Sequence, residues 1–534
     1  MSSLLWGRRA LTAFVVLFTA LIVLPRVTAD AGQYTTIDGS GSSWASVALD
    51  QWANDVQPQG LTINYNPDGS AQGRLDWIQG SLVDYSGSDP PFRSGHDKLA
   101  GTASEHSPFS YSYVPDTAGG TAFMYHLTVH GHQVRNLRLD PKVIMEIFTG
   151  AITNWDDPQI TKIYGAQLPS EPITPVLRAD GSGATYFFTL WMSTLFPSQW
   201  NKFCEKVHPG ITLPCGNTEF YPSFHGSKSE NGSIASADYV TASYGEGSID
   251  YDEYAYALNA HYPVVQVLNP ANYFVGPTAS NVAVALTKAQ INEDSSSPNF
   301  LQQNLNQVYT FTDKRSYPLS SYSYLIVPRT GGPESTFFHN SAGAGKSLSA
   351  YINFFLCAGQ KQSADLGYSP LPLNLVKGGL EQNDHIPGHG SIADVNKYSS
   401  CPNPTFTNGV LTVLKNAPEP SPCQKLGAPL NCVVKNGKAV AAGGGGAGGS
   451  GGGSSGSGNG KNNSSGSNGN PAAGGATGTG PTEGAANVTG SVVNLASNGT
   501  DRAVLALITA LAVVMAVAAP PAVGSWLRRR KRRA

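Results

Sequence analysis

The sequence predicts an α/β fold, built as two lobes that lie outside the cell. Strand-like runs alternate with segments of helical spacing, and three of the turns between them carry a Gly-Ser pair. About 400 residues separate an N-terminal export signal from a glycine-rich tract, which is too many for one hydrophobic core and typical of two lobes.

The N-terminus has the pattern of a secretory signal. Arg8 and Arg9 precede an apolar run from Ala10 to Leu24, and small residues follow at Ala29 and Ala31. We therefore expect a signal peptide over residues 1–31, with an uncleaved N-terminal anchor as the alternative.

The C-terminus has the pattern of a membrane anchor. Residues 503–527 are almost all apolar, enough for a helix that crosses a bilayer of about 30 Å. The six residues 528–533 are all basic, so residues 528–534 are expected in the cytoplasm and the preceding chain outside. The alternative, a basic tail that binds nucleic acid, fits poorly because the charges adjoin the apolar stretch.

A Gly/Ser-rich stretch, residues 441–500, separates the body from this anchor. Such a sequence buries too little apolar surface to fold, so we expect a disordered tether. The chain has 34 Lys and Arg and 36 Asp and Glu; without residues 1–31 and 501–534, 24 basic and 34 acidic residues remain. This net charge of −10 argues against nucleic-acid binding, and an anion would have to be held by local donors.

Six cysteines in an exported chain indicate disulfides. We expect a local bridge between Cys204 and Cys215, and bridges within the C-terminal part for the other four: Cys357, Cys401, Cys423 and Cys432. A zinc site is disfavoured because no C-x-x-C spacing occurs.

Three strand–turn–helix units organise the body. We expect strands at 34–38, 61–64 and 174–177, turns at 39–43, 67–70 and 178–183, and helices at 44–56, around 75–78 and at 186–195. The start of a helix exposes unpaired backbone N–H groups that attract anions, and strand ends meet at one edge of an α/β sheet. Three such turns predict an anion site, although a serine N-cap explains any one of them.

Three charged residues sharpen this prediction. Arg178 can give two hydrogen bonds to an oxyanion, and Asp180 could hold its guanidinium in place; a surface ion pair is the alternative for Arg178. Asp89 can accept a hydrogen bond only from an anion that carries a proton. Phosphate carries one near neutral pH and sulfate does not, so Asp89 would reject sulfate.

These segments resemble the bacterial periplasmic phosphate-binding proteins, the receptors of ABC-type phosphate importers. The resemblance covers most of residues 33–380 and rests on six motifs: Gly39-Ser40-Gly41-Ser42-Ser43-Trp44, Asn64-Tyr65 through Gly69-Ser70, Val83-Asp84-Tyr85 through Asp89, Ile147 to Asp157, Arg178-Ala179-Asp180-Gly181-Ser182-Gly183, and Gly247 to Ala257.

The resemblance implies a phosphate site with eight contact residues: Ser43, Trp44, Ser70, Asp89, Arg178, Ser182, Gly183 and Ala184. Trp44 would contribute its backbone N–H. Ala184 stands where the family has threonine, so one hydroxyl is lost, and Thr185 could partly compensate. Asp180 and Thr185 would support the site.

The resemblance also implies a type II periplasmic-binding-protein-like fold with discontinuous lobes that close about a hinge. We place one lobe at residues 33–118 and 316–435 and the other at 119–315. The implied partners are inorganic phosphate and ABC permease subunits in the membrane, with no cofactor, no metal, no nucleic acid and a monomeric state.

Two other functions remain open. Residues from about 200 to 235 and from about 380 to 435 have little counterpart in the resembled family and hold five of the six cysteines. These additions, the anchor and the tether also suit a surface phosphate sensor or an interaction protein on the same fold, and a phosphate-ester hydrolase is a third possibility. Enzymatic motifs are weak, so we do not expect an enzyme: Gly343 to Ser347 resembles a nucleotide loop, but Asn340 replaces its first glycine. His130 and His132 lack a third metal ligand, so we expect them to be ordinary polar residues.

Overall fold

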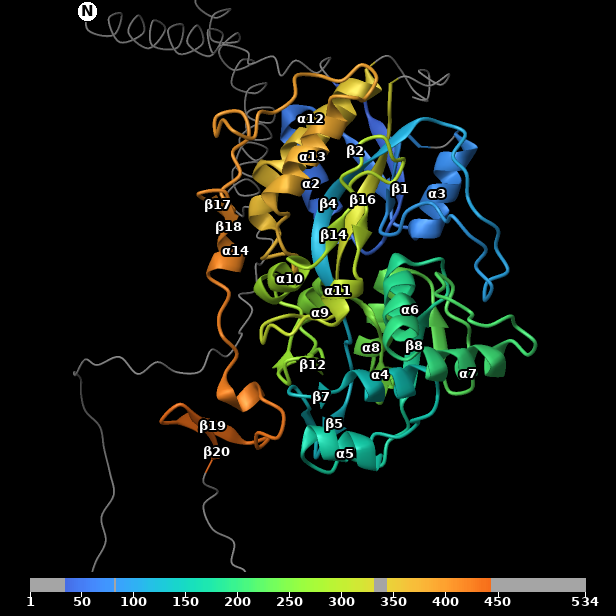
Figure 1. Cartoon of the computed structure of the whole chain (residues 1–534), viewed down its shortest axis with the longest axis vertical. Coiled ribbons are helices and arrows are strands. Elements are labelled where there is room, and N and C mark those ends of the chain that lie inside the picture. Colours follow the sequence, from blue (N-terminus) through green and yellow to red (C-terminus); the bar gives the residue numbers. More distant parts are fainter. Residues whose placement is uncertain (1–33, 81–82, 331–342, 443–534) are drawn as a thin grey trace, which may run out of the picture. The chain divides into compact units, whose positions relative to one another are not determined.

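The computed structural model describes residues 34–80, 83–330 and 343–442 (Figure 1). All of them belong to one compact unit, Met1–Gly448, while the second unit, Gly449–Ala534, lies outside the described residues. Helices and strands alternate along the described chain, so the predicted α/β class is confirmed.

A six-stranded sheet forms what we call the large-sheet region. Its strands lie in the order β11-β4-β16-β3-β1-β2, with the bounds β1 (Ile37–Gly41), β2 (Ile63–Asn66), β3 (Tyr85–Ser88), β4 (Tyr111–Ala122), β11 (Asp252–Glu253) and β16 (Ser320–Pro328). Because β1 pairs in parallel with both β2 and β3, their carboxyl ends meet at the same edge. β16 runs antiparallel between β3 and β4.

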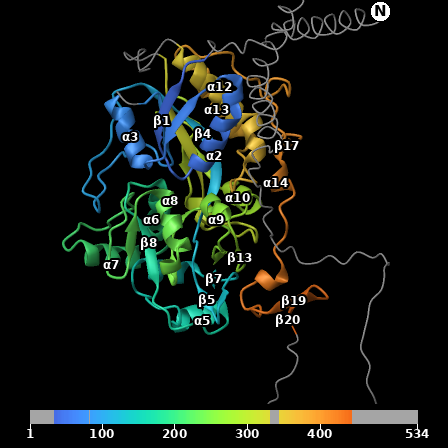
Figure 2. The same cartoon turned by 180° about the vertical axis from the view of Figure 1, so that it is seen from behind.

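Helices cover both faces of this sheet. Figures 1 and 2 show three helices on one face and α3 (Ser70–Gln79) on the other; the three are α2 (Ser46–Val56), α12 (Ala344–Leu356) and α13 (Leu373–Asn383). Stacked rings of Trp52 and Phe355, with centroids 5.4 Å apart, join α2 to α12. Glycine at 73 allows α3 to approach β1 closely, since a Cβ at this position would lie only 2.5 Å from the Cα of Gly41.

Most of residues 124–316 form a second, small-sheet region. Its two three-stranded sheets are β10 (Ser248–Ile249)-β8 (Thr174–Arg178)-β9 (Lys228–Glu230) and β13 (Phe274–Val275)-β12 (Gln266–Leu268)-β7 (Arg138–Leu139). Its helices are α4 (Pro141–Phe148), α5 (Pro158–Tyr164), α6 (Gly183–Leu195), α7 (Pro197–Val207), α8 (Gly232–Thr241), α9 (Tyr254–Ala260), α10 (Ala279–Leu286) and α11 (Asn306–Tyr309). Short strand pairs complete it: β5 (Thr128–Val129) with β6 (His132–Gln133), and β14 (Gln290–Ile291) with β15 (Gln303–Asn304).

Aromatic side chains fill the core of the small-sheet region. The ring of Phe188 on α6 lies 5.0 Å from that of Phe148 and 4.8 Å from that of Tyr251, all three buried. This packing fixes α6, and therefore the turn that precedes it, against the sheet that contains β8.

The chain passes between the two regions at three places: after β4, at β11 and before β16. β4 pairs with β16 along most of its length, and its last residues pair with β11, which follows β10 of the small-sheet region. The third passage precedes β16. The two regions are therefore joined by strands that are themselves part of the large sheet.

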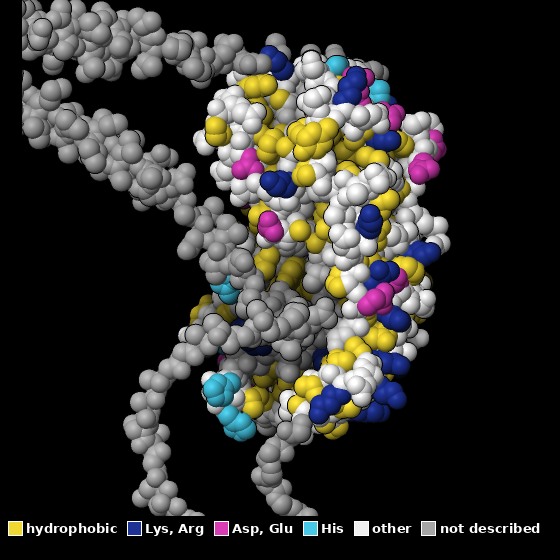
Figure 3. Space-filling view, turned by 90° about the vertical axis from the view of Figure 1, so that its left-hand side faces the viewer, with side chains coloured by type: hydrophobic (Ala, Val, Ile, Leu, Met, Phe, Trp, Pro, Cys, Tyr) yellow, Lys and Arg dark blue, Asp and Glu magenta, His cyan; other side chains and the backbone are white. Residues whose placement is uncertain are grey.

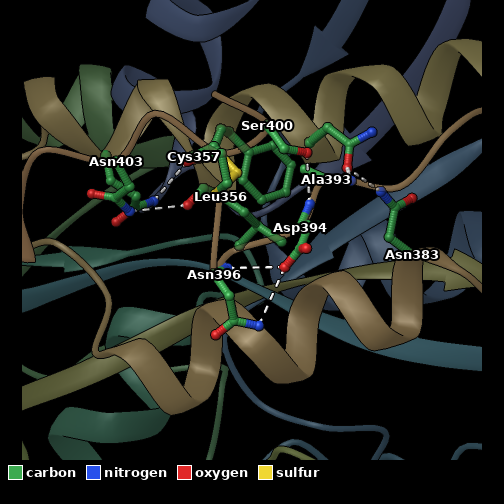
Figure 4. The surroundings of a disulfide bond; sticks show 12 residues. Leu356, Cys357, Asn383, Ala393, Asp394, Asn396, Ser400 and Asn403 are labelled. Carbon is green, nitrogen blue, oxygen red and sulfur yellow. Dashed lines mark hydrogen bonds between the residues drawn. A yellow bond between two sulfur atoms is a disulfide. The ribbon is translucent and has the colours of Figure 1, made fainter. Parts of the chain in front are cut away.

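A C-terminal segment, residues 401–442, contacts both regions and contains β17 (Phe406–Thr407), β18 (Val410–Leu411), α14 (Thr412–Lys415), β19 (Cys432–Lys435) and β20 (Lys438–Ala441). The Cys357–Cys401 disulfide joins it to the end of α12, where Asn403 also donates to the carbonyl of Leu356 (Figure 4). Further along, Arg138 Nη2 of the small-sheet region donates to the carbonyl of Cys423 over 3.0 Å.

The three disulfides are Cys204–Cys215, Cys357–Cys401 and Cys423–Cys432. The predicted local bridge is confirmed, and so is the prediction that the other four cysteines bridge within the C-terminal part.

Several predicted boundaries are wrong by a few residues. The strand expected at 61–64 is β2 at Ile63–Asn66, and the helix expected at 186–195 begins at Gly183. The expected strand at 34–38 begins at Ile37 and continues through Gly41, so Gly39 to Gly41 lie in β1 rather than in a turn. Glycine suits this strand because a Cβ on Gly39 would lie within 2.3 Å of the Tyr85 ring that packs beside it.

Four predicted segments lie outside the described residues: the signal peptide at 1–31, nearly all of the tether at 441–500, the anchor helix at 503–527 and the tail at 528–534. Among the residues that are described, no helix combines the length and the hydrophobicity needed to cross a bilayer.

Candidate anion-binding site

Four strands of the two regions end beside one another. Ser42 and Ser43 follow β1, Ser70 begins α3 after β2, and Asp89 follows β3. In the small-sheet region, Arg178 ends β8 and leads into the turn before α6. Gly69 makes the second turn possible, because its φ of +104° is unfavourable for other residues.

Asp89 lies between the turns that follow β1 and β2. Its two carboxylate oxygens accept hydrogen bonds from Ser42 Oγ at 2.7 Å and Ser70 Oγ at 3.0 Å. A Cβ on Gly183, at the start of α6, would lie 1.9 Å from Asp89 Oδ2. Glycine at 183 thus allows the turn of the small-sheet region to contact Asp89 of the large-sheet region.

Arg178 uses all five of its N–H donors. Asp180 accepts from Nε at 2.8 Å and also from Nη2, and Asp252 accepts from Nη1 at 3.1 Å. The two remaining N–H groups donate to neutral hydroxyls, Ser233 Oγ at 2.9 Å and Ser43 Oγ at 2.7 Å. Since the carboxylates already balance its charge, the hydroxyl contacts are the ones that an oxyanion would replace.

A hydroxyl pair links the two regions at this point. Ser233 Oγ donates to Asp252 Oδ1 at 2.9 Å, so in its 2.8 Å contact with Ser43 it is the acceptor. Ser43 therefore accepts from Arg178 and donates to Ser233. Arg178, Ser233 and Asp252 thus hold the hydroxyl of Ser43 in one orientation.

Sequence reasoning missed Ser42, Ser233 and Asp252. Ser42 lies in the predicted first turn, and Asp252 lies inside the Gly247–Ala257 motif, so both were within segments already singled out. Ser233 follows Asn231-Gly232 at the start of α8, a helix-start signal that was not connected with the site.

Several backbone N–H groups near these side chains have no acceptor among the described residues. They belong to Ser43, Trp44, Ser70, Gly183 and Ala184, at or just before the starts of α2, α3 and α6. Each helix start also carries a partial positive charge. All five residues are buried, so these donors suit an anion that replaces water completely.

The remaining predicted residues have structural contacts. Ser182 is the N-cap of α6 and accepts from the backbone N–H of Thr185 at 3.4 Å, which is the simple capping role considered from the sequence. Thr185 Oγ1 lies 2.8 Å from the Tyr251 hydroxyl, and Ala184 is fully buried. The Trp44 ring packs edge-on against Tyr368, with centroids 5.9 Å apart.

Burial controls the ionisation of this site. It raises the pKa of Asp89, although hydrogen bonds from Ser42 and Ser70 and the charge of Arg178 lower it in part. Behind Asp89, burial raises the pKa of Asp116 to about 8. Burial, together with the charge of Asp252, also raises the pKa of Glu253 well above its ordinary value. Asp116 therefore holds a proton at neutral pH, which reduces the repulsion of an anion.

Burial disfavours the charge of Arg178 as well, but Asp252 and Asp180 overcome this effect and raise its pKa. Arg178 is therefore a permanent cation. On the face of the molecule in Figure 3, Lys and Arg side chains lie beside Asp and Glu side chains. Because charges of both signs are mixed on this face, it offers no broad positive surface, and an anion would be held by the local donors of the site.

The described residues contain no group of three His, Cys, Asp or Glu side chains arranged to hold a metal. His130 has a φ of 51° in the exposed turn between β5 and β6, and His132 is exposed on β6. The two histidines thus lie at the turn and on the second strand of the β5–β6 hairpin.

A family comparison identifies the fold. Residues 26–358 match the model of the PBP superfamily domain, which is more than half of the chain and includes every residue of the site described above. The chain belongs to the PBP superfamily. The resemblance inferred from the sequence motifs is confirmed at this level.

Relatives of this superfamily member include proteins described as phosphate-binding protein PstS. The one from Xylella fastidiosa (strain Temecula1) is 29% identical over 344 residues, which is 64% of this chain and 83% of the relative. The one from Methanocaldococcus jannaschii is 27% identical over 350 residues, 64% of this chain and 84% of the relative. PstS3 from Mycobacterium bovis (strain BCG) is 28% identical over 347 residues, with the same two coverages. These relatives are binding proteins, in agreement with the prediction that the chain is not an enzyme.

Solved structures of phosphate-binding proteins are also similar. A high-affinity periplasmic phosphate-binding protein called PfluDING, solved with phosphate, has a TM-score of 0.47 and 18% identity, covering 64% of this chain and 92% of its own. A substrate-binding protein from Clostridium perfringens with bound phosphate has a TM-score of 0.39 and 19% identity, covering 63% of this chain and all of its own.

Proposed function

We propose that this protein captures inorganic phosphate outside the cell and delivers it to an ABC-type import permease. Residues 33–118 and 316–435, which contain most of the large sheet, form one lobe, and residues 119–315, which contain the small sheets, form the other. The two lobes close about a hinge. The protein works as a monomer held by a single C-terminal anchor, with its binding body extracellular. The names of the relatives support the ligand. The permease partner is what the resemblance of the sequence motifs to the receptors of ABC-type phosphate importers implies.

One observation carries the choice of ligand: a buried carboxylate, Asp89, lies among the donors of the site. A hydrogen bond between Asp89 and phosphate needs one proton, and either of the two groups can carry it. Sulfate has no proton to give, so Asp89 must first take one from solvent before sulfate can bind. The other contacts are the hydroxyls of Ser43 and Ser70, the guanidinium of Arg178, and the backbone at Trp44, Ser182, Gly183 and Ala184.

Calorimetric titration of the purified full-length chain with phosphate, and separately with sulfate, tests this proposal. We expect micromolar or tighter phosphate binding and no sulfate binding at pH 7.5. Because burial raises the pKa of Asp89, sulfate binding should appear as the pH falls and Asp89 takes up a proton.

The variant Asp89→Asn should bind sulfate at pH 7.5, because the amide adds a donor and removes the negative charge. Ser112→Ala is the control. Ser112 is also buried, but its hydroxyl donates to Gln382 and not to Asp89, so this variant should still bind phosphate and not sulfate. Equal phosphate and sulfate affinity in the wild type would end the proposal.

A second role, a surface phosphate sensor, is favoured by one observation. The C-terminal segment contacts both regions, through Cys357–Cys401 and through Arg138 and Cys423, so closure would move the chain that leads toward the tether. Phosphate uptake by cells that lack this protein separates the roles, because a sensor is not required for transport itself. A phosphatase assay tests the remaining alternative, a phosphate-ester hydrolase.

A further inference from the structure

A second buried arginine lies beside the anion site. Arg74 is one helical turn after Ser70 on α3 and is 0% exposed. Its Nη1 donates to Ser88 Oγ at 2.8 Å, next to Asp89 in the chain. Arg74 is thus fixed to two of the turns that form the site in the large-sheet region.

Glu219 of the small-sheet region reaches across to this arginine. Its two carboxylate oxygens accept from Arg74 Nη2 at 2.8 and 2.6 Å, and Arg93 Nη2 lies 3.3 Å away. The side chain of Glu219 is 2% exposed, so water weakens this ion pair very little. Figures 1 and 2 show α3 of the large-sheet region facing α6 of the small-sheet region.

The backbone of Glu219 holds the third turn of the site. Its carbonyl accepts from the N–H of Ser182 at 3.0 Å, directly before Gly183. In the same boundary, the N–H of Ala71 donates to the carbonyl of Gly181 at 3.0 Å. A single residue therefore connects Arg74 on α3 with the turn that contains Ser182.

The neighbours of Glu219 strengthen this boundary. Thr218 Oγ1 donates to the buried Asp97 at 2.7 Å, and Lys98 Nζ donates to the carbonyl of Pro214 at 2.7 Å. The segment that makes these contacts begins beside the Cys204–Cys215 disulfide. This segment therefore contacts residues 97–98 of the large-sheet region as well as Arg74.

We infer that Glu219 is a positioning residue that, through Arg74, locks the second and third anion-binding turns together and slows the release of bound phosphate. The inference rests on the proposed function, since it names what controls release from that same site. Glu219 contacts no part of the proposed ligand cage with its side chain, and it acts through Arg74 and through Ser182.

Glu105 provides a matched control. It also pairs with Arg74, at 2.7 Å, and with Arg93, but it belongs to the large-sheet region and does not cross the boundary. Glu105→Gln and Glu219→Gln each remove one negative charge from the same pair of arginines. Of these two variants, only Glu219→Gln weakens an ion pair that crosses between the regions.

The test loads the full-length protein with radiolabelled inorganic phosphate and measures release during a chase with unlabelled phosphate. Glu219→Gln should release phosphate at least about ten-fold faster, with a smaller change in the association rate, and Glu105→Gln should change release less than about three-fold. Equal acceleration by the two variants, or none by Glu219→Gln, overturns the inference.

Two further measurements keep the result decisive. If Glu219→Gln does not fold, the double variant Arg74→Met/Glu219→Gln removes the ion pair together with its buried arginine, and it should also release phosphate faster. X-ray scattering without phosphate should give a larger radius of gyration for Glu219→Gln than for Glu105→Gln. This second result decides the link between the regions even if the wild type binds no phosphate, which would end the proposed function alone.

Discussion

Two buried arginines lie at the boundary between the regions, and they differ in what each contacts across it. Arg178 has one carboxylate partner, Asp180, beside it in its own region and a second, Asp252, on β11, one of the strands that join the two regions. Its contact with the first turn of the large-sheet region is the neutral hydroxyl of Ser43. Arg74 contacts the other region through a carboxylate, Glu219. A neutral hydroxyl can be exchanged for an anionic ligand, whereas a buried ion pair resists exchange. The first arginine is thus suited to binding and the second to holding the regions together.

The largest expected effect separates the two arginines by stability. Arg74→Met leaves Glu219 and Glu105 with only Arg93 as a cation, and an uncompensated buried charge costs about 3–5 kcal/mol. Because Arg93 remains 3.3 Å from Glu219, we expect the lower end of this range. Urea unfolding of the wild type and the variant measures the difference.

If Arg74→Met leaves the free energy of unfolding unchanged, the contrast between a structural and a ligand-binding arginine fails. A surface control with the same chemistry is Arg135→Met, since Arg135 makes exposed contacts with Gln133 and with the carbonyl of His261. That substitution should cost less than about 0.5 kcal/mol.

The next effect concerns affinity. Arg178→Lys keeps the charge beside Asp180 and Asp252 but loses the planar five-donor geometry, so phosphate affinity should fall by at least about 2 kcal/mol, or ~30-fold. Calorimetry measures the affinity, and urea unfolding shows how far stability follows. An unchanged affinity would mean that Arg178 only neutralises its neighbours.

The sequence predicted the parts of this site that depend on local pattern. Asp180 lies two residues after Arg178, and the turns with Ser43, Ser70 and Asp89 follow strands whose parallel pairing brings their ends together. The structure does bring Ser70 to Asp89 and Ser43 to Arg178. The assignment of these residues to phosphate remains a prediction.

The contacts across the boundary could not be predicted in the same way. Glu219 lies outside the six motifs that carry the resemblance, and no periodicity links it to Arg74, which is 145 residues away. Ser233 likewise reaches Ser43 only because α8 packs on β8. Such pairs depend on how separate elements pack, and a single sequence carries no signal for that.

The last prediction uses pH to examine the carboxyl behind the site. Burial raises the pKa of Asp116 to about 8, so the folded protein holds this proton more tightly than the unfolded chain does. The contribution of Asp116 to the free energy of unfolding is therefore largest at acid pH. It declines by about 1.4 kcal/mol per pH unit as the pH rises toward 8. Asp116→Asn replaces the titrating carboxyl with an amide that does not titrate, so between pH 6 and pH 8 the variant should lose less stability than the wild type.

Urea unfolding at pH 5.5, 6.5, 7.5 and 8.5 measures the two slopes. Asp238→Asn, at an exposed position on α8, is the matched control and should follow the wild type. Parallel slopes for the wild type and Asp116→Asn would mean that Asp116 is ionised in the folded protein. The anion would then meet a second negative charge behind Asp89, and Arg178 would have to offset both.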